Sequence, residues 1–175
     1  MRLTAFLPTL SACLVLAACS PRTEPEPPAE PQPLSADMMA NLMAADGAAH
    51  TVAVLTGPAD PTGIDKVFAG IASGDPEWLA LVPTLQPALD GEHAEGLQHA
   101  LAAALPLNPA GVLTLLPDYA HPDTVCAPTA PADARTAAAR AAVEAVANPP
   151  LQAARSECMG FLDGVKPARA EPMQR

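Results

Sequence analysis

Apolar residues recur three and four positions apart through most of residues 35–164, and polar residues fill the positions between them. This spacing matches the period of an amphipathic helix. Two stretches show it most regularly, and their apolar positions are Ile64, Val67, Phe68 and Ile71 in the first and Leu97, Leu101 and Leu105 in the second. The pattern predicts an all-α domain, which we expect to be a compact bundle of about six or seven short helices.

Three of the predicted helices begin with an Asx-Pro pair. The pairs are Asp60-Pro61, Asp75-Pro76 and Asn108-Pro109. An Asp or Asn side chain can cap the first turn, and proline suits the first helical position. The pairs are fifteen and thirty-three residues apart, so they share no period. A compact bundle is therefore favoured over the alternative, a short array of stacked helix pairs that resembles HEAT repeats.

Other segments are predicted from weaker signals. A helix is expected to start at Ser35, and two more are expected over 133–148 and 150–164. Residues 50–57 include β-branched side chains and could form a strand, but no partner strand is evident, so a helix is expected there as well. Pro83 should kink or shorten the helix that follows Asp75-Pro76.

The first eighteen residues have the layout of a secretory signal, with a positive charge at Arg2, an apolar run and small residues before Cys19. Leu16-Ala17-Ala18-Cys19 resembles the lipobox of bacterial lipoproteins. The resemblance implies that residues 1–18 are cleaved off and that Cys19 becomes the mature N-terminus, with a diacylglycerol on its thiol and a fatty acyl chain such as palmitate on its amine. Ser20 follows where inner-membrane lipoproteins often have Asp, which implies an outer-membrane anchor facing the periplasm.

Residues 19–34 are rich in proline and glutamate, a composition that favours an extended tether over a packed segment. At about 3.1 Å per residue, a polyproline-like stretch of this length holds the next domain on the order of 50 Å from the lipid surface. The alternative is a proline-rich ligand for a partner domain. The globular domain is then residues 35–164, and residues 165–175 are predicted to form a disordered tail.

Charge and composition limit the partners of this domain. The chain has a formal net charge of −10 at pH 7, so nucleic acid is not an expected partner, and membrane attachment should depend on the lipid rather than on a basic face. Half of the residues are apolar but only 3% are aromatic. The core must therefore be built from Ala, Leu and Val in closely packed helices.

The four cysteines divide into two pairs. Cys13 leaves with the signal and Cys19 carries the lipid, so Cys126 and Cys158 remain in the mature chain. Two thiols in an oxidising compartment predict one structural disulfide. A redox-active pair is the alternative, but the two residues do not form a C-x-x-C motif.

Candidate chemistry is concentrated in one predicted helix. Glu92, Glu95 and His99 fall at i, i+3 and i+7, so one face could present two carboxylates and an imidazole to a metal ion, whereas His93 points elsewhere. The order of these residues differs from HExxH, in which two histidines one turn apart bind zinc. Acidic residues are common in the first turn of a helix, so a solvated helix face is the favoured interpretation. No cofactor is predicted.

A second candidate is the loop that holds Asp118, Tyr119, His121 and Asp123, which could bind a cation or a partner. Turn formation explains the same residues more simply. Trp78 lies on an apolar helix face and is expected in the core.

Motifs for a catalytic nucleophile or a phosphate-binding loop are not found in the sequence. We therefore expect a lipid-anchored helical protein of the cell envelope that acts as a protein-interaction or structural module for an envelope partner that the sequence does not identify. The alternatives are a metal-dependent envelope enzyme and a small-ligand binder, each using Glu92, Glu95 and His99.

Overall fold

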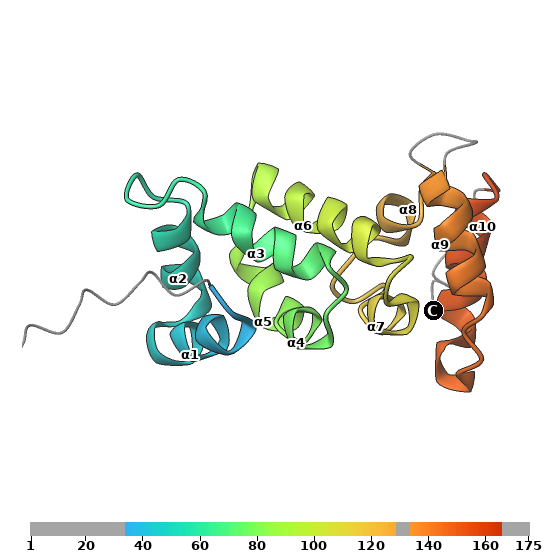
Figure 1. Cartoon of the computed structure of the whole chain (residues 1–175), viewed down its shortest axis with the longest axis horizontal. Helices are drawn as coiled ribbons and strands as arrows, with labels where there is room; N and C mark the ends of the chain where they lie inside the picture. Colours follow the sequence, from blue (N-terminus) through green and yellow to red (C-terminus); the bar gives the residue numbers. More distant parts are fainter. Residues whose placement is uncertain (1–33, 129–133, 166–175) are drawn as a thin grey trace, which may run out of the picture. The chain divides into compact units, whose positions relative to one another are not determined.

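The computed structural model describes residues 34–128 and 134–165, and every regular element within them is helical (Figure 1). The all-α prediction is therefore confirmed. The longer helices are α1 (Ala36–Asp46), α2 (Ala48–Leu55), α3 (Gly63–Ala72), α6 (Gly91–Ala104), α9 (Ala134–Glu144) and α10 (Gln152–Leu162). The short helical turns are α4 (Pro76–Leu79), α5 (Val82–Leu85), η1 (Gln86–Ala88), α7 (Pro109–Leu113), α8 (Pro122–Val125) and η2 (Pro149–Leu151).

Several sequence predictions fall on residues that the structure does not describe. The signal peptide, the lipobox with Cys19 and the tether up to residue 33 precede the described ranges. The predicted tail follows them, apart from Val165, whose N–H donates to the Gly160 carbonyl at the end of α10 over 2.9 Å. These predictions remain expectations. Within the described ranges, no helix combines the length and the apolar character needed to cross a bilayer.

Local capping explains where most of the helices begin. The Ser35 hydroxyl accepts from the N–H of Met38 at 3.2 Å and caps α1 as expected. The Asp75 carboxylate accepts from the N–H of Glu77 at 2.8 Å, with Pro76 in the first turn of α4. The Asn108 side chain caps α7 in the same way, because its Oδ1 accepts from the N–H of Gly111, the third residue of that helix, at 3.0 Å. Two of the three predicted Asx-Pro starts are thus confirmed.

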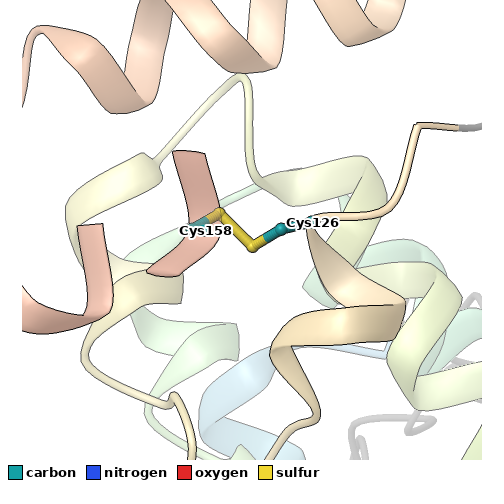
Figure 2. Close-up of a disulfide and its surroundings, with 2 residues drawn as sticks. All are labelled: Cys126 and Cys158. Carbon is teal, nitrogen blue, oxygen red and sulfur yellow. A yellow bond between two sulfur atoms is a disulfide. The ribbon is translucent and has the colours of Figure 1, made fainter. Parts of the chain in front are cut away.

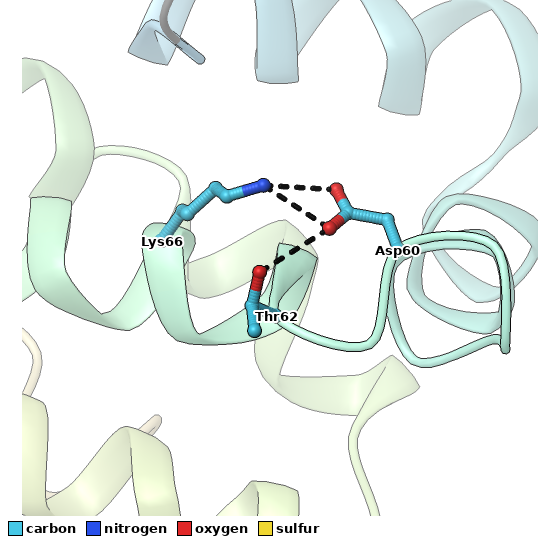
Figure 3. A network of polar contacts seen from close by, with 3 residues as sticks. All are labelled: Asp60, Thr62 and Lys66. Carbon is cyan, nitrogen blue, oxygen red and sulfur yellow. Dashed lines mark hydrogen bonds and ion pairs between the residues drawn. The ribbon is translucent and has the colours of Figure 1, made fainter.

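The third start, at Asp60, is wrong. A turn forms first, in which the N–H of Gly63 donates to the Asp60 carbonyl at 3.0 Å, so α3 begins at Gly63. The Asp60 carboxylate faces Lys66, with its Oδ1 3.1 Å from Nζ, and also accepts from the Thr62 hydroxyl at 3.4 Å (Figure 3). The Asp60 carbonyl therefore closes the turn, and its carboxylate pairs with Lys66 near the start of α3 instead of capping a helix at residue 61.

Prolines divide the segment after Asp75. Pro83 lies in the first turn of α5 and Pro87 in η1, so one predicted helix becomes three short pieces. This division is one reason why the described residues contain more helical segments than the six or seven expected. Residues 50–57, for which a strand had been the alternative, lie largely in α2.

The central packing pairs α3 with α6, and Figure 1 shows these two helices side by side. The short helices that follow them, α4 and α7, also contact each other. Two helix pairs, α3 with α4 and α6 with α7, therefore pack against each other. The Asn108 side chain joins the two pairs, because its Nδ2 donates to the Gly74 carbonyl at 2.8 Å. A local stack of helix pairs thus exists within the bundle, although the Asx-Pro spacings did not indicate one.

The core is aliphatic, as the composition predicts. Most of the regular apolar positions of α3 and α6 are buried, among them Val67, Ile71, Leu97 and Leu101, each 0% exposed, whereas Phe68 is partly buried against the core. Trp78 is half-buried and packs against this core beside Gly70. A Cβ added to Gly70 would lie 2.4 Å from ring atoms of Trp78, so glycine is what allows the indole to approach α3 so closely.

Helices α8, α9 and α10 are joined by a disulfide and by Arg155. Figure 2 shows Cys126, which follows α8, bonded to Cys158 of α10, as predicted, and both residues are fully buried. The Arg155 guanidinium donates to the carbonyls of Val143 and Glu144 at 3.1 and 2.8 Å. These bonds satisfy carbonyls at the last turn of α9, so that helix ends at Glu144 and not near residue 148 as expected.

Candidate functional site

A cavity of about 370 Å³ opens between α6, α8 and η1. It forms where α6 packs against α8. Polar side chains from all three elements surround it. The lining residues are Gln86, Ala94, Glu95, Gln98, His99, His121 and Thr124. This cavity is the candidate functional site, because residues far apart in the sequence converge on it.

Gln98 is the best-defined side chain of the cavity. It is only 8% exposed, and its Oε1 accepts a hydrogen bond from the backbone N–H of His121 at 2.9 Å. Because this bond requires the amide oxygen, it fixes the amide orientation and leaves the NH2 group on the other side. Helix α6 and the start of α8 are joined through this bond.

The hydrogen bonding of Gln98 also indicates where its NH2 group is accessible. In the described part of the chain, no protein group accepts a hydrogen bond from its Nε2, and no fully buried side-chain polar atom lacks a partner. Nε2 must therefore be accessible, and Gln98 belongs to the cavity lining. A buried amide in this position presents two fixed N–H donors to whatever enters.

The sequence-predicted metal site is not formed. Glu95 and His99 line the cavity, but Glu92 does not. Glu92 and His99 are seven residues apart, which is about 10 Å along a helix, and a metal ion needs its ligands within about 2 Å. Among residues 34–128 and 134–165, no three His, Cys, Asp or Glu side chains are grouped so that they could hold a metal ion. Helical spacing on one face was therefore not sufficient to bring Glu92, Glu95 and His99 together around one metal ion.

The second predicted cluster is divided. His121 joins the cavity, whereas Asp118 and Tyr119 do not line it. Asp123 borders a different hollow of about 300 Å³, together with Ala127, Pro128, Phe161 and Gly164. The loop therefore contributes one side chain to the site and does not form a site of its own.

Sequence reasoning missed Gln86, Gln98 and Thr124. One signal could have identified Gln98, because it is a polar residue between Leu97 and the apolar positions at 100 and 101 of α6. A polar side chain on a buried helix face needs a hydrogen-bond partner or a ligand. Gln86 and Thr124 carry no such signal, since both lie in short turns whose positions depend on packing.

The lining residues can donate hydrogen bonds to a ligand and also accept them from it. The Gln98 amide donates, and the Thr124 hydroxyl and the imidazoles of His99 and His121 can donate or accept. Glu95 adds a carboxylate, which accepts hydrogen bonds and attracts positive charge. The arrangement suits recognition of a small polar molecule.

Comparison of this chain with protein-family models, with curated proteins and with solved structures gave no match.

Proposed function

We propose that this protein is a bacterial lipoprotein whose helical domain is anchored in the cell envelope through Cys19 and acts there as an interaction module. The Leu16-Ala17-Ala18-Cys19 lipobox supports export and lipidation, and the Pro/Glu-rich segment after it supports a tether. An anchor that carries several acyl chains is long-lived, because each buried methylene contributes about 0.8 kcal/mol to membrane binding.

The observation that carries this proposal is the buried disulfide between Cys126 and Cys158. Disulfides form and persist in oxidising compartments and are rare in the reducing cytosol. The pair lies more than a hundred residues after the lipobox, so it supports export independently of the N-terminal sequence. Both signals favour the periplasmic side of the envelope, and Ser20 favours the outer membrane as the site of attachment.

An interaction role is supported by exposed apolar residues on neighbouring helices. Met38 and Leu42 lie one turn apart on α1 and are 39% and 37% exposed, and Val54 on α2 is 52% exposed. Helices α1 and α2 contact each other. Apolar side chains held at a rigid helix surface are suited to contact with another protein.

Cys19→Ser tests the anchor. Wild-type protein should fractionate with envelope membranes and carry a lipidated N-terminal cysteine in mass spectrometry, whereas the variant should be soluble or keep its signal. Cys13→Ser is the matched control, because it removes a signal-peptide thiol and leaves the lipobox cysteine unchanged. An unmodified Cys19 at the N-terminus of the mature wild-type protein would refute the anchor.

The interaction role is tested by crosslinking and capture from envelopes with wild-type protein and with Met38→Glu/Leu42→Glu. We expect the double variant to lose the partner that wild type captures, while its far-ultraviolet circular dichroism spectrum stays helical. Ala44→Glu adds a charge at another exposed position of α1 and should retain the partner. Equal capture by all three proteins would show that this surface is not the contact.

A further inference from the structure

We infer that the cavity between α6, α8 and η1 binds a small zwitterion with one carboxylate and one ammonium group, the chemistry of a free amino acid or a very short peptide. This inference goes beyond the proposed function and does not depend on it. The lipobox and the cavity share no residue, so the two can be tested separately.

The first argument is the NH2 group of Gln98, which is accessible although the residue as a whole is only 8% exposed. Its amide oxygen is held by the N–H of His121 at 2.9 Å, so the side chain cannot turn to present an acceptor without breaking that bond. This NH2 group is held in place and has no protein acceptor in the described ranges, so an oxygen acceptor is the favourable group opposite it in a molecule that enters the cavity. The carboxylate is the strongest such acceptor among small metabolites, because its hydrogen bonds are charge-assisted.

The second argument is the charge of the lining. Of the cavity residues in the described ranges, only Glu95 is formally charged when the histidines are neutral, and the whole chain has a net charge of −10. A simple anion would be repelled by the Glu95 carboxylate. A simple cation would offer no acceptor to the NH2 of Gln98, which would then donate only to water. A molecule with both charges satisfies both groups.

The spacing of these two residues agrees with a small zwitterion. Glu95 and Gln98 lie at i and i+3 on α6, so their Cβ atoms are about 5–6 Å apart on the same helix face. Their polar ends can therefore contact the two charged groups of one small molecule. His99 and Thr124 add hydrogen-bonding groups beside them.

The size of the cavity and its polar side chains match a small polar ligand. Its volume of about 370 Å³ is near the lower limit of ligand pockets, which is about 300 Å³. Ala94 is the one apolar residue of the lining within the described ranges, and the only rings among those residues are the imidazoles of His99 and His121. A small polar molecule would find hydrogen-bonding partners on most of these side chains.

The test uses the full, lipid-anchored chain in detergent, labelled with ¹⁵N, and follows the side-chain NH2 resonance of Gln98. Alanine is added first, followed in separate titrations by acetate, ethylammonium and glycerol. We expect alanine to shift this resonance and to saturate, whereas acetate and ethylammonium each require at least about tenfold higher concentrations. An unchanged resonance at about 10 mM alanine, or equal binding of acetate or glycerol, would overturn the inference.

The dipeptide alanyl-alanine distinguishes the two sources of this chemistry. Tighter binding of alanine assigns the site to free amino acids, and tighter binding of the dipeptide assigns it to short peptides. Both results support the zwitterion. Cys19→Ser should bind the same ligand as wild type, so loss of the anchor and loss of the ligand are separate outcomes.

Three variants connect binding to the two polar groups. Gln98→Glu keeps an oxygen for the N–H of His121 but replaces the NH2 donor, so alanine should bind at least about tenfold more weakly. Glu95→Gln changes an exposed side chain and should abolish the preference for alanine over acetate, which keeps the test decisive if Gln98→Glu does not fold. Glu92→Gln is the matched control, because it removes the same charge from α6 outside the cavity. Equal weakening by Glu92→Gln and Glu95→Gln, or no weakening by Glu95→Gln, would contradict the inference.

Discussion

Replacing Cys126 and Cys158 together with alanine should lower the free energy of unfolding by about 3.7 kcal/mol. The cysteines are 32 positions apart, so the bridge closes a loop of about 33 residues, and the chain-entropy relation gives this value at 25 °C. Alanine is preferred to serine because both sites are 0% exposed. A buried hydroxyl without a partner would add about 1–3 kcal/mol of unrelated destabilisation.

Urea unfolding, followed by far-ultraviolet circular dichroism, measures this difference. Oxidised wild type, reduced wild type and the double alanine variant should be compared at one protein concentration. Reduced wild type and the variant should unfold at similar midpoints, both well below oxidised wild type, and the melting temperature should fall by roughly 10 °C. Reducing agent should leave the variant unchanged, which controls for effects elsewhere in the protein.

A loss below about 1 kcal/mol would refute this reasoning, because it would mean that the bridge does not restrict the unfolded chain as the loop length requires. The slope of the transition provides a second check. Unfolded chains without the bridge should expose more surface, so the denaturant dependence should increase in the variant and in reduced wild type.

Other local contacts give smaller effects that the same urea experiment can measure. Gly70→Ala should lower the free energy of unfolding by about 1–3 kcal/mol and shift the fluorescence emission of the single tryptophan, because the new methyl group meets the Trp78 ring. An unshifted emission spectrum would contradict the close approach. Asn108→Ala should lower the free energy of unfolding by about 1–2 kcal/mol. Asn108→Asp should lower it less, because Asp keeps the cap of α7 and loses only the donor to the Gly74 carbonyl. Equal losses would show that the cap does not matter. Arg155→Ala should lower the free energy of unfolding by about 1 kcal/mol or more, because it leaves the last carbonyls of α9 without their donor. Lys66→Ala breaks an exposed ion pair and should lower it by less than about 1 kcal/mol. The reverse order would contradict the capping role of Arg155.

The parts of the fold that were predictable from the sequence depend on short-range interactions. Ser35, Asp75 and Asn108 cap helices through N–H groups two or three residues ahead, so their effect can be recognised in the sequence. Asp60 has the same local signal, but its carboxylate pairs with Lys66 and its carbonyl closes a turn. The end of α9 was predicted too late for a related reason, since it depends on Arg155 of the following helix.

The candidate site was predictable only in part. Periodicity placed Glu95 and His99 on one face of α6, where both line the cavity. It could not show that His121 would approach from a position 23 residues after Gln98, because that contact depends on how α8 packs against α6. The role of Gln98 is set by the backbone N–H of His121, and spacing within one helix does not reveal such a partner.

The Cys126–Cys158 bond also determines how the folded chain would carry a mechanical load. If the two ends of the protein are pulled apart, tension passes directly from Cys126 to Cys158 through the sulfur atoms, and α9 between them bears none. An extended chain gains about 3.3–3.6 Å per residue, so the 32-residue separation withholds roughly 110 Å of contour length until the bond is reduced. For a domain held at one end by a tether, the bridge would keep α9 and the first part of α10 outside the force-bearing path.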